Sequence, residues 1–200
     1  GTQAFMRFDY PGTLAADIQA RALDVARRFL CAVGFDHGLF NMEFFYDEPT
    51  NRLTVIEFNP RMAAQFSDLY LRVRGIDLHQ LALALAHGQD PAGVPRSTPT
   101  AGAAASFVYR SLSERAVVRM PDAAQQEALT QAFAQALLFC FAKTPSQIAR
   151  DFKWLGSYRY GILHLAASDA QQLKADCEHA SALLGWPAPY ADVTAQQGIG

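Results

Sequence analysis

The sequence lacks paired cysteines, long apolar runs and an excess of either charge. Its 200 residues include only three cysteines, far apart in the chain, with no CxxC pair and no Cys/His ligand spacing. This argues against a disulfide framework and a thiolate metal site, and it is typical of reduced thiols in a cytoplasmic protein. No apolar run approaches the roughly 18 residues of a membrane-spanning helix, and the N-terminus has no signal-peptide profile. We therefore expect a globular cytoplasmic protein without a membrane partner.

Basic runs and several common site motifs are missing too. The formal net charge is −2 and 18% of the residues are charged, which argues against nucleic acid as a partner. No GxSxG, GxGxxG or P-loop motif is present, so a hydrolase nucleophile elbow and a glycine-rich phosphate loop are not indicated. The only lysines are Lys143, Lys153 and Lys174.

The sequence does contain regular strand and helix patterns. Half of the residues are hydrophobic, enough for one large domain or two small ones. Alternation of apolar residues predicts strands over residues 3–9, 40–46, 53–59, 103–110, 116–120 and 157–167. Spacing of three to four predicts helices over residues 14–33, 78–87, 122–142 and 168–184, and a short helix ending at 73.

Two local details accompany the predicted helices. Arg21, Arg27 and Arg28 lie mostly off the apolar stripe of the first helix, so we expect them to be solvated. Asp77 and Gln80 form a capping-box pattern at the start of the helix over 78–87.

A proline-rich stretch divides the chain. Three prolines fall among Gly, Ser and Thr between residues 90 and 102, which favours a linker. We expect a first lobe at 1–90, a linker at 91–102, a small α+β subdomain at 103–186 and a loose tail at 187–200. The order of strands and helices predicts an α+β fold.

The most informative stretch is a predicted hairpin within residues 38–61. Because side chains alternate along a strand, Asn41 and Glu43 on the first strand share a face with Glu57 and Asn59 on the second. Pairing the strands about the loop places Glu43 roughly opposite Glu57. Two carboxylates ~5 Å apart repel by roughly 3 kcal/mol at an effective dielectric of 20. A protonated acid, an intervening arginine or a bound cation would each relieve that repulsion.

A divalent cation is the functional interpretation of this cluster. Mg²⁺ prefers oxygen ligands, usually one or two carboxylates plus substrate phosphates, and Glu43, Glu57 and Asn59 offer such a set. The alternative is that these are ordinary solvent-exposed positions on an open sheet face. Arg61 could bind a phosphate in the same site, or could simply neutralise Glu57.

The hairpin and the residues after it resemble the ATP-grasp superfamily of ligases. The family pattern is an acid on one strand and hydrophobic-Glu-x-Asn-x-Arg on the next, here Glu43 followed by IEFNPR at 56–61. The GIDL at 75–78, before a Leu/Ala helix, is similar to a segment of biotin carboxylase-like and carboxylate–amine ligases, as is the YPGTL at 10–14. The resemblance implies the C-terminal lobe of an ATP-grasp fold, an antiparallel sheet with helices, followed by a small α+β subdomain.

The resemblance also implies an activity. Glu43 and Glu57 would bridge Mg²⁺ (or Mn²⁺) to the phosphates of ATP, Asn59 would be a further metal ligand, and Arg61 would be the catalytic residue that holds an acyl phosphate or a substrate carboxylate. The implied enzyme is a carbon–nitrogen ligase, in which a carboxylate attacks the γ-phosphate and an amine then displaces phosphate. Its partners would be small-molecule carboxylate and amine substrates and N-terminal domains of the same protein.

The chain departs from this family at two points. MAAQ at 62–65 stands where many relatives have a glycine pair, which alters the expected substrate pocket. Relatives clamp ATP with lysines of an N-terminal lobe, whereas no lysine precedes Lys143 here. We therefore expect the C-terminal part of an enzyme, and an isolated chain that has no turnover and binds ATP poorly.

Two other functions stay open. A biotin carboxylase-like enzyme would use carboxyphosphate, but such relatives usually place a Gln and a Glu soon after the arginine. Here Gln65 is followed by no acid until Asp68, which favours amino-acid or small-carboxylate ligation. The same scaffold could also be a noncatalytic binding or dimerisation module, including a homodimer.

Overall fold

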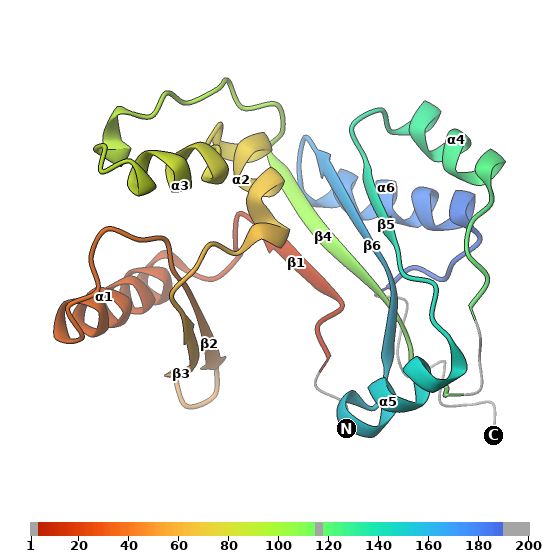
Figure 1. Ribbon diagram of the computed structural model, residues 1–200, viewed down its shortest axis with the longest axis horizontal. Coiled ribbons are helices and arrows are strands. Elements are labelled where there is room, and N and C mark those ends of the chain that lie inside the picture. The colour runs from red at the N-terminus through yellow and green to blue at the C-terminus, as the bar shows by residue number, and fades with distance from the viewer. Residues whose placement is uncertain (1–3, 115–117, 190–200) are drawn as a thin grey trace. The chain divides into compact units, whose positions relative to one another are not determined.

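The computed structural model describes residues 4–114 and 118–189, and it divides them into two compact units. The hairpin unit is Gly12–Pro99. The sheet unit comprises the described parts of Gly1–Pro11 and Thr100–Gly200. Figure 1 shows the elements of both units, which are described separately below.

The sheet unit contains a four-stranded antiparallel sheet in the order β1-β4-β6-β5. Its strands are β1 (Arg7–Tyr10), β4 (Ala103–Ser111), β5 (Leu137–Cys140) and β6 (Tyr158–Ala167). Its helices are α4 (Ala123–Ala132), α5 (Pro145–Leu155) and α6 (Ala170–Leu184). Helix α6 packs against β4 and β6, and α4 packs against α6 (Figure 1).

The apolar core of the chain is concentrated in this sheet unit. Phe107, Leu163 and Cys177 from β4, β6 and α6 are completely buried. Burying such side chains contributes roughly 1.5–3 kcal/mol each for the large apolar ones. A buried hydrogen bond of 2.8 Å between the Tyr109 and Ser181 hydroxyls fixes the helix on the sheet. Burial strongly raises the pKa of Tyr109, so this phenol stays protonated.

The predicted helix over 122–142 is wrong in its second half. Helix α4 ends at Ala132, and Leu137–Cys140 instead pairs with β6 as strand β5. Leu129 reaches the core from the helix, Phe133 from the position just after it, and Leu138 from the strand. Because a strand can bury the same apolar residues, the spacing of four was not specific for a helix. Helix α5, capped by Thr144 with Pro145 in its first turn, was not predicted.

The predicted strand over 116–120 is not found. Residues 116 and 117 lie outside the described residues, and 118–120 form no strand. The predicted tail at 187–200 falls beyond the described residues from position 190 onward. Within the described ranges, no helix is long and apolar enough to cross a membrane.

The hairpin unit consists of one hairpin, three α-helices and two short 3₁₀ turns. Its elements are α1 (Ala16–Ala32), β2 (Asn41–Asp47), β3 (Arg52–Asn59), η1 (Ala64–Phe66), α2 (Ser67–Arg74), α3 (Leu78–Ala86) and η2 (Pro91–Gly93). Helix α1 packs on the hairpin through the edge-to-face pair of Phe29 and Phe58, with ring centres 5.0 Å apart. Asp77 caps α3 as expected, because its Oδ1 accepts from the amides of His79 and Gln80.

Arg21 is partly exposed, and it also forms hydrogen bonds that its helical position did not predict. Its Nη1 donates to the Asn51 Oδ1 at 2.6 Å, and its Nη2 donates to the Asn51 carbonyl oxygen at 2.9 Å. Asn51 lies in the hairpin turn with φ of 51°, a left-handed conformation that Asn tolerates well. Helix α1 is therefore tied to the turn of the hairpin as well as to its strands.

The structure groups the first residues differently from the expected lobe at 1–90. Strand β1 pairs with β4, with Arg7 opposite Phe107 and Tyr10 opposite Ala104. Residues up to Pro11 therefore belong to the sheet unit. The chain enters the hairpin unit after Pro11 and returns to the sheet unit between Pro99 and Thr100. This return to the sheet unit lies within the proline-rich stretch at 91–102.

Candidate metal and phosphate site

The four predicted site residues lie at one end of the hairpin. In the ladder of β2 and β3, Glu43 is directly opposite Glu57 and Asn41 is directly opposite Asn59. The register shifts between Glu43 and Phe44, because Phe44 pairs with Val55 and leaves Ile56 as the extra residue of a bulge. Bulges twist strands and redirect side chains next to functional sites. The predicted pairing of the two acids is confirmed.

Contacts hold the acids close together. The Asn59 Nδ2 donates a hydrogen bond of 2.6 Å to the Glu57 Oε1, so the amide oxygen of Asn59 is the atom left to coordinate a cation. Burial and then the charge and side-chain hydrogen bond of Glu57 raise the pKa of Glu43, against a weaker opposing attraction from Arg61. The repulsion anticipated from the sequence is therefore present in the folded chain.

Arg61 is near this pair without neutralising it by contact. Its backbone amide donates to the Asn59 carbonyl oxygen at 2.8 Å, and its Nη1 donates to the Met62 carbonyl oxygen at 3.3 Å. Within the described parts of the chain, Arg61 forms no ion pair with Glu43 or Glu57, although its charge acts on Glu43. A role of Arg61 as the counter-ion of Glu57 is therefore disfavoured. The guanidinium of Arg61 is available to bind an anionic ligand.

The donor set suits a hard divalent cation bound together with an anionic ligand. Two carboxylates and an amide oxygen are ligands that Mg²⁺ and Mn²⁺ accept. In the described ranges, no group of three or more His, Cys, Asp or Glu side chains could hold a metal. The remaining coordination positions would have to be filled by phosphate oxygens or water, which is how Mg²⁺ is usually held in nucleotide sites.

A cavity beside Arg61 was not predicted from the sequence. Its volume is about 360 Å³, and it lies between α3, the segment before β2 and the segment after β3. Its lining includes Phe35, His37, Arg61, Met62 and Leu85. The lining is mostly apolar, with a cationic group at Arg61 and a carboxylate at Asp36, so an organic anion in this cavity would bind at Arg61. Its residues come from three separate segments, so no local pattern could have identified it.

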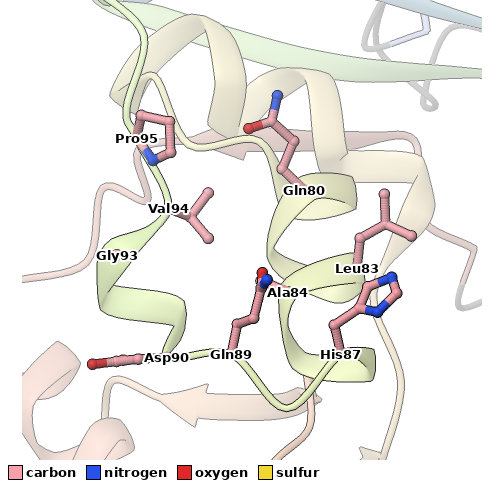
Figure 2. A pocket seen from close by; sticks show the side chains of 9 residues that line it. All are labelled: Gln80, Leu83, Ala84, His87, Gln89, Asp90, Gly93, Val94 and Pro95. Carbon is pink, nitrogen blue, oxygen red and sulfur yellow. The ribbon is translucent and has the colours of Figure 1, made fainter.

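A second cavity of about 440 Å³ lies on α3 away from these residues. Figure 2 shows its lining side chains, which come from α3 and from the segment that follows it up to Pro95. Asp90 is its only carboxylate, and the Asp90 Oδ1 already accepts the amide of Ala92 at 2.8 Å. None of the four predicted site residues lines this cavity. We therefore do not assign it to the metal site, although it is larger than the cavity beside Arg61.

The raised pKa of Glu43 predicts how stability depends on pH without metal. A folded-state pKa above the ordinary value of 4.5 means that the native state favours the protonated acid, so this contribution is present at low pH. The free energy of unfolding should therefore fall as pH rises from about 4.5 through the raised pKa of Glu43. Urea unfolding at a series of pH values in a chelator would measure the slope. Glu43→Gln should flatten it, and an unchanged slope would contradict the assigned cause.

Comparison with known proteins identifies the fold. Models of known protein families give no match. The chain is 30% identical over 112 residues to the carbamoyl phosphate synthase large chain of Pseudothermotoga lettingae, which is 56% of this chain and 10% of that protein. Among solved structures, the L-amino acid ligase of Bacillus licheniformis gives a TM-score of 0.61 at 14% identity, over 86% of this chain and 41% of that one.

Two further solved structures are similar. The N5-carboxyaminoimidazole ribonucleotide synthetase of Thermus thermophilus gives a TM-score of 0.59 at 16% identity, over 93% of this chain and 45% of that one. The biotin carboxylase of Campylobacter jejuni, solved as a βγ-ATP complex, gives 0.58 at 17% identity, over 90% and 38%. The chain therefore has the α+β fold of the ATP-grasp ligases, over less than half the length of these solved structures.

Proposed function

We propose that the intact protein is an ATP-dependent ligase and that this chain is its C-terminal part, which carries the Mg²⁺ and phosphate half of the active site. The observation that carries the proposal is the pair Glu43 and Glu57, held directly opposite each other although they repel. A fold shared with ATP-grasp ligases supports it. Missing parts of the same protein would supply the lysines that clamp ATP.

The four residues have two parts in the proposed reaction. Glu43, Glu57 and the amide oxygen of Asn59 hold Mg²⁺ or Mn²⁺ against the ATP phosphates, and the ion supplies charge neutralisation for phosphoryl transfer when bound. Arg61 holds the acyl phosphate or the substrate carboxylate, because a planar guanidinium binds such groups through two parallel hydrogen bonds. The chain contributes mainly position and charge, which dominate catalysis of phosphoryl transfer.

The proposed substrates are an amino acid or another small carboxylate and an amine. Similarity to an L-amino acid ligase supports this class, as does the absence of an acid between Gln65 and Asp68. Similarity to biotin carboxylase supports a second candidate, a reaction through carboxyphosphate made from bicarbonate. A mostly apolar cavity beside Arg61 is better suited to an organic carboxylate than to bicarbonate.

The test is ADP release by the intact protein with Mg²⁺-ATP. Pairs of amino acids should stimulate release, and bicarbonate without a second carboxylate should not. Stimulation by bicarbonate alone would establish the second candidate instead. Binding of Mn²⁺ without any substrate-dependent ADP release would indicate a noncatalytic module. The isolated chain should release no ADP, and turnover by it alone would contradict the division of the site between two parts.

A further inference from the structure

Helix α5 of the sheet unit ends in two exposed apolar side chains. Trp154 is 74% exposed and Leu155 is 56% exposed, whereas Ile148 on the same helix is buried in the core. Phe152 also packs against that core, with its ring centre 6.0 Å from the ring centre of Tyr158. The sheet unit therefore already uses the apolar face of α5, and the indole at the end of the helix lies outside the core.

Helical geometry explains why Trp154 points away from the core. Side chains four positions apart lie on the same side of a helix, so Ile148 and Phe152 share the buried side of α5. Arg150 and Trp154 share the exposed side for the same reason. The Lys153 Nζ lies 5.3 Å from the centre of the Trp154 ring, which is within the range of a cation–π contact. The exposed side of α5 thus presents an indole with cations beside it.

The charge of this segment is opposite to that of the chain as a whole. Residues 143–155 contain three cationic side chains and one acid, whereas the formal net charge of the chain is −2. The acid is already engaged, because the Asp151 Oδ2 accepts from the Lys143 Nζ at 2.6 Å and the Asp151 Oδ1 lies 3.5 Å from the Arg150 Nη2. Among the residues that the structure describes, Lys153 has no carboxylate in an ion pair with it. The surface around the indole is therefore net cationic.

We propose that the exposed end of α5 is a docking surface for a separate protein that presents an acidic segment with an apolar side chain. The surface consists of Arg150, Lys153, Trp154 and Leu155. Tryptophan is enriched among the few residues that dominate binding energy at protein interfaces. Opposite charges around such a residue steer the partner and fix its orientation. The proposal is independent of the ligase reaction.

Three other occupants fit this surface less well. A symmetric contact between two copies of the chain would bring Arg150 and Lys153 of both copies together, and like charges disfavour association. A helix that lies in a bilayer inserts its whole apolar face, but Ile148 and Phe152 are already packed in the core. A nucleic acid would be repelled by the net negative charge of the chain.

Trp154 itself reports binding, because the chain has two tryptophans and the other, Trp186, is buried. Acrylamide should quench the Trp154 fluorescence of the chain alone. A short synthetic peptide with a central Leu flanked by Glu residues should shield the indole from acrylamide and shift its emission to shorter wavelength. Two control peptides, one with Lys in place of Glu and one with Ser in place of Leu, should bind at least about tenfold more weakly.

The same fluorescence measurement identifies the other occupants. Shielding of Trp154 that grows with the concentration of the chain alone would indicate a second copy. Shielding by phosphatidylglycerol vesicles or by oligouridylate, but not by the acidic peptide, would indicate a membrane or an RNA. An indole that is already shielded in the intact protein would mean that another part of the same protein covers it. Each of these results would overturn the proposal.

Substitutions decide whether the end of α5 is responsible. Trp154→Ala should fold, because the side chain lies outside the core, and calorimetry should show at least about a tenfold loss of affinity for the acidic peptide. Leu23→Ala, which removes an apolar side chain 68% exposed on α1, should bind as the unaltered chain does. Lys153→Gln should weaken binding about threefold and reduce its salt dependence. Lys174→Gln, at an exposed lysine 4.0 Å from the Glu178 Oε1, should change neither. Equal affinities of Trp154→Ala and Leu23→Ala, or no binding of the acidic peptide, would overturn the proposal.

Discussion

Glu57→Gln in the intact protein is expected to lower Mg²⁺-dependent ADP release by more than about 100-fold, since losing a residue that merely supports a metal ligand already costs about 10–100-fold. Gln keeps the size of the side chain and the hydrogen-bond partner of Asn59, but it removes one of the two carboxylates. Binding of Mn²⁺, followed by its electron paramagnetic resonance, should weaken in parallel. This second measurement separates loss of the ion from a general loss of activity.

Glu48→Gln provides the matched control. Glu48 lies in the turn of the same hairpin with an exposed side chain, and only its backbone carbonyl is used, by the amide of Asn51. This variant removes the same charge at the far end of the two strands and should leave ADP release and Mn²⁺ binding unchanged. If Glu57→Gln releases ADP as fast as Glu48→Gln, the acids do not hold the metal and the proposed site is refuted.

The hairpin was predictable because its information is local. A loop of a few polar residues brings the two strands together, and alternation along each strand puts the two acids and the two asparagines on one face. The bulge at Ile56 was not predicted, although the pairing of the acids depends on it. Continuing the register of Phe44 and Val55 would place Glu43 opposite Ile56, and the extra residue brings Glu57 there instead. The identities of the acids and the amide were enough to suggest a cation.

Features that depend on distant segments could not be predicted in the same way. Strand β1 pairs with β4, whose residues lie almost a hundred positions later, and nothing near Arg7 specifies Phe107 as its partner. Leu137–Cys140 became strand β5 because the edge of β6 was available for pairing. The hydrogen bonds of Arg21 to Asn51 join a helix to a turn 30 residues away. A single sequence carries the propensity of each segment but not the choice of its partner.

Gly75 provides the largest predicted effect on stability. It ends helix α2 with φ of +65°, and a Cβ at this position would lie 1.8 Å from the carbonyl oxygen of Ser97. Its own carbonyl oxygen accepts the amide of Ser97 at 2.9 Å, so the two backbones are held together. Gly75→Ala must therefore strain the left-handed conformation and separate the two segments. We expect a loss of about 3 kcal/mol or more in the free energy of unfolding of the hairpin unit, above the usual range for surface substitutions.

Gly88→Ala separates the two causes of that loss. Gly88 has φ of +68°, almost the same backbone conformation, but nothing lies within 4 Å of a Cβ built on it. Its substitution should cost only the left-handed strain of about 1–2 kcal/mol. Amide hydrogen exchange across α2 and α3 would measure both variants, and Ser97 should lose protection in Gly75→Ala alone. Equal losses in the two variants would mean that strain accounts for the whole effect and that the contact with Ser97 contributes nothing. A larger loss in Gly75→Ala would establish that the contact with Ser97 stabilises the end of α2.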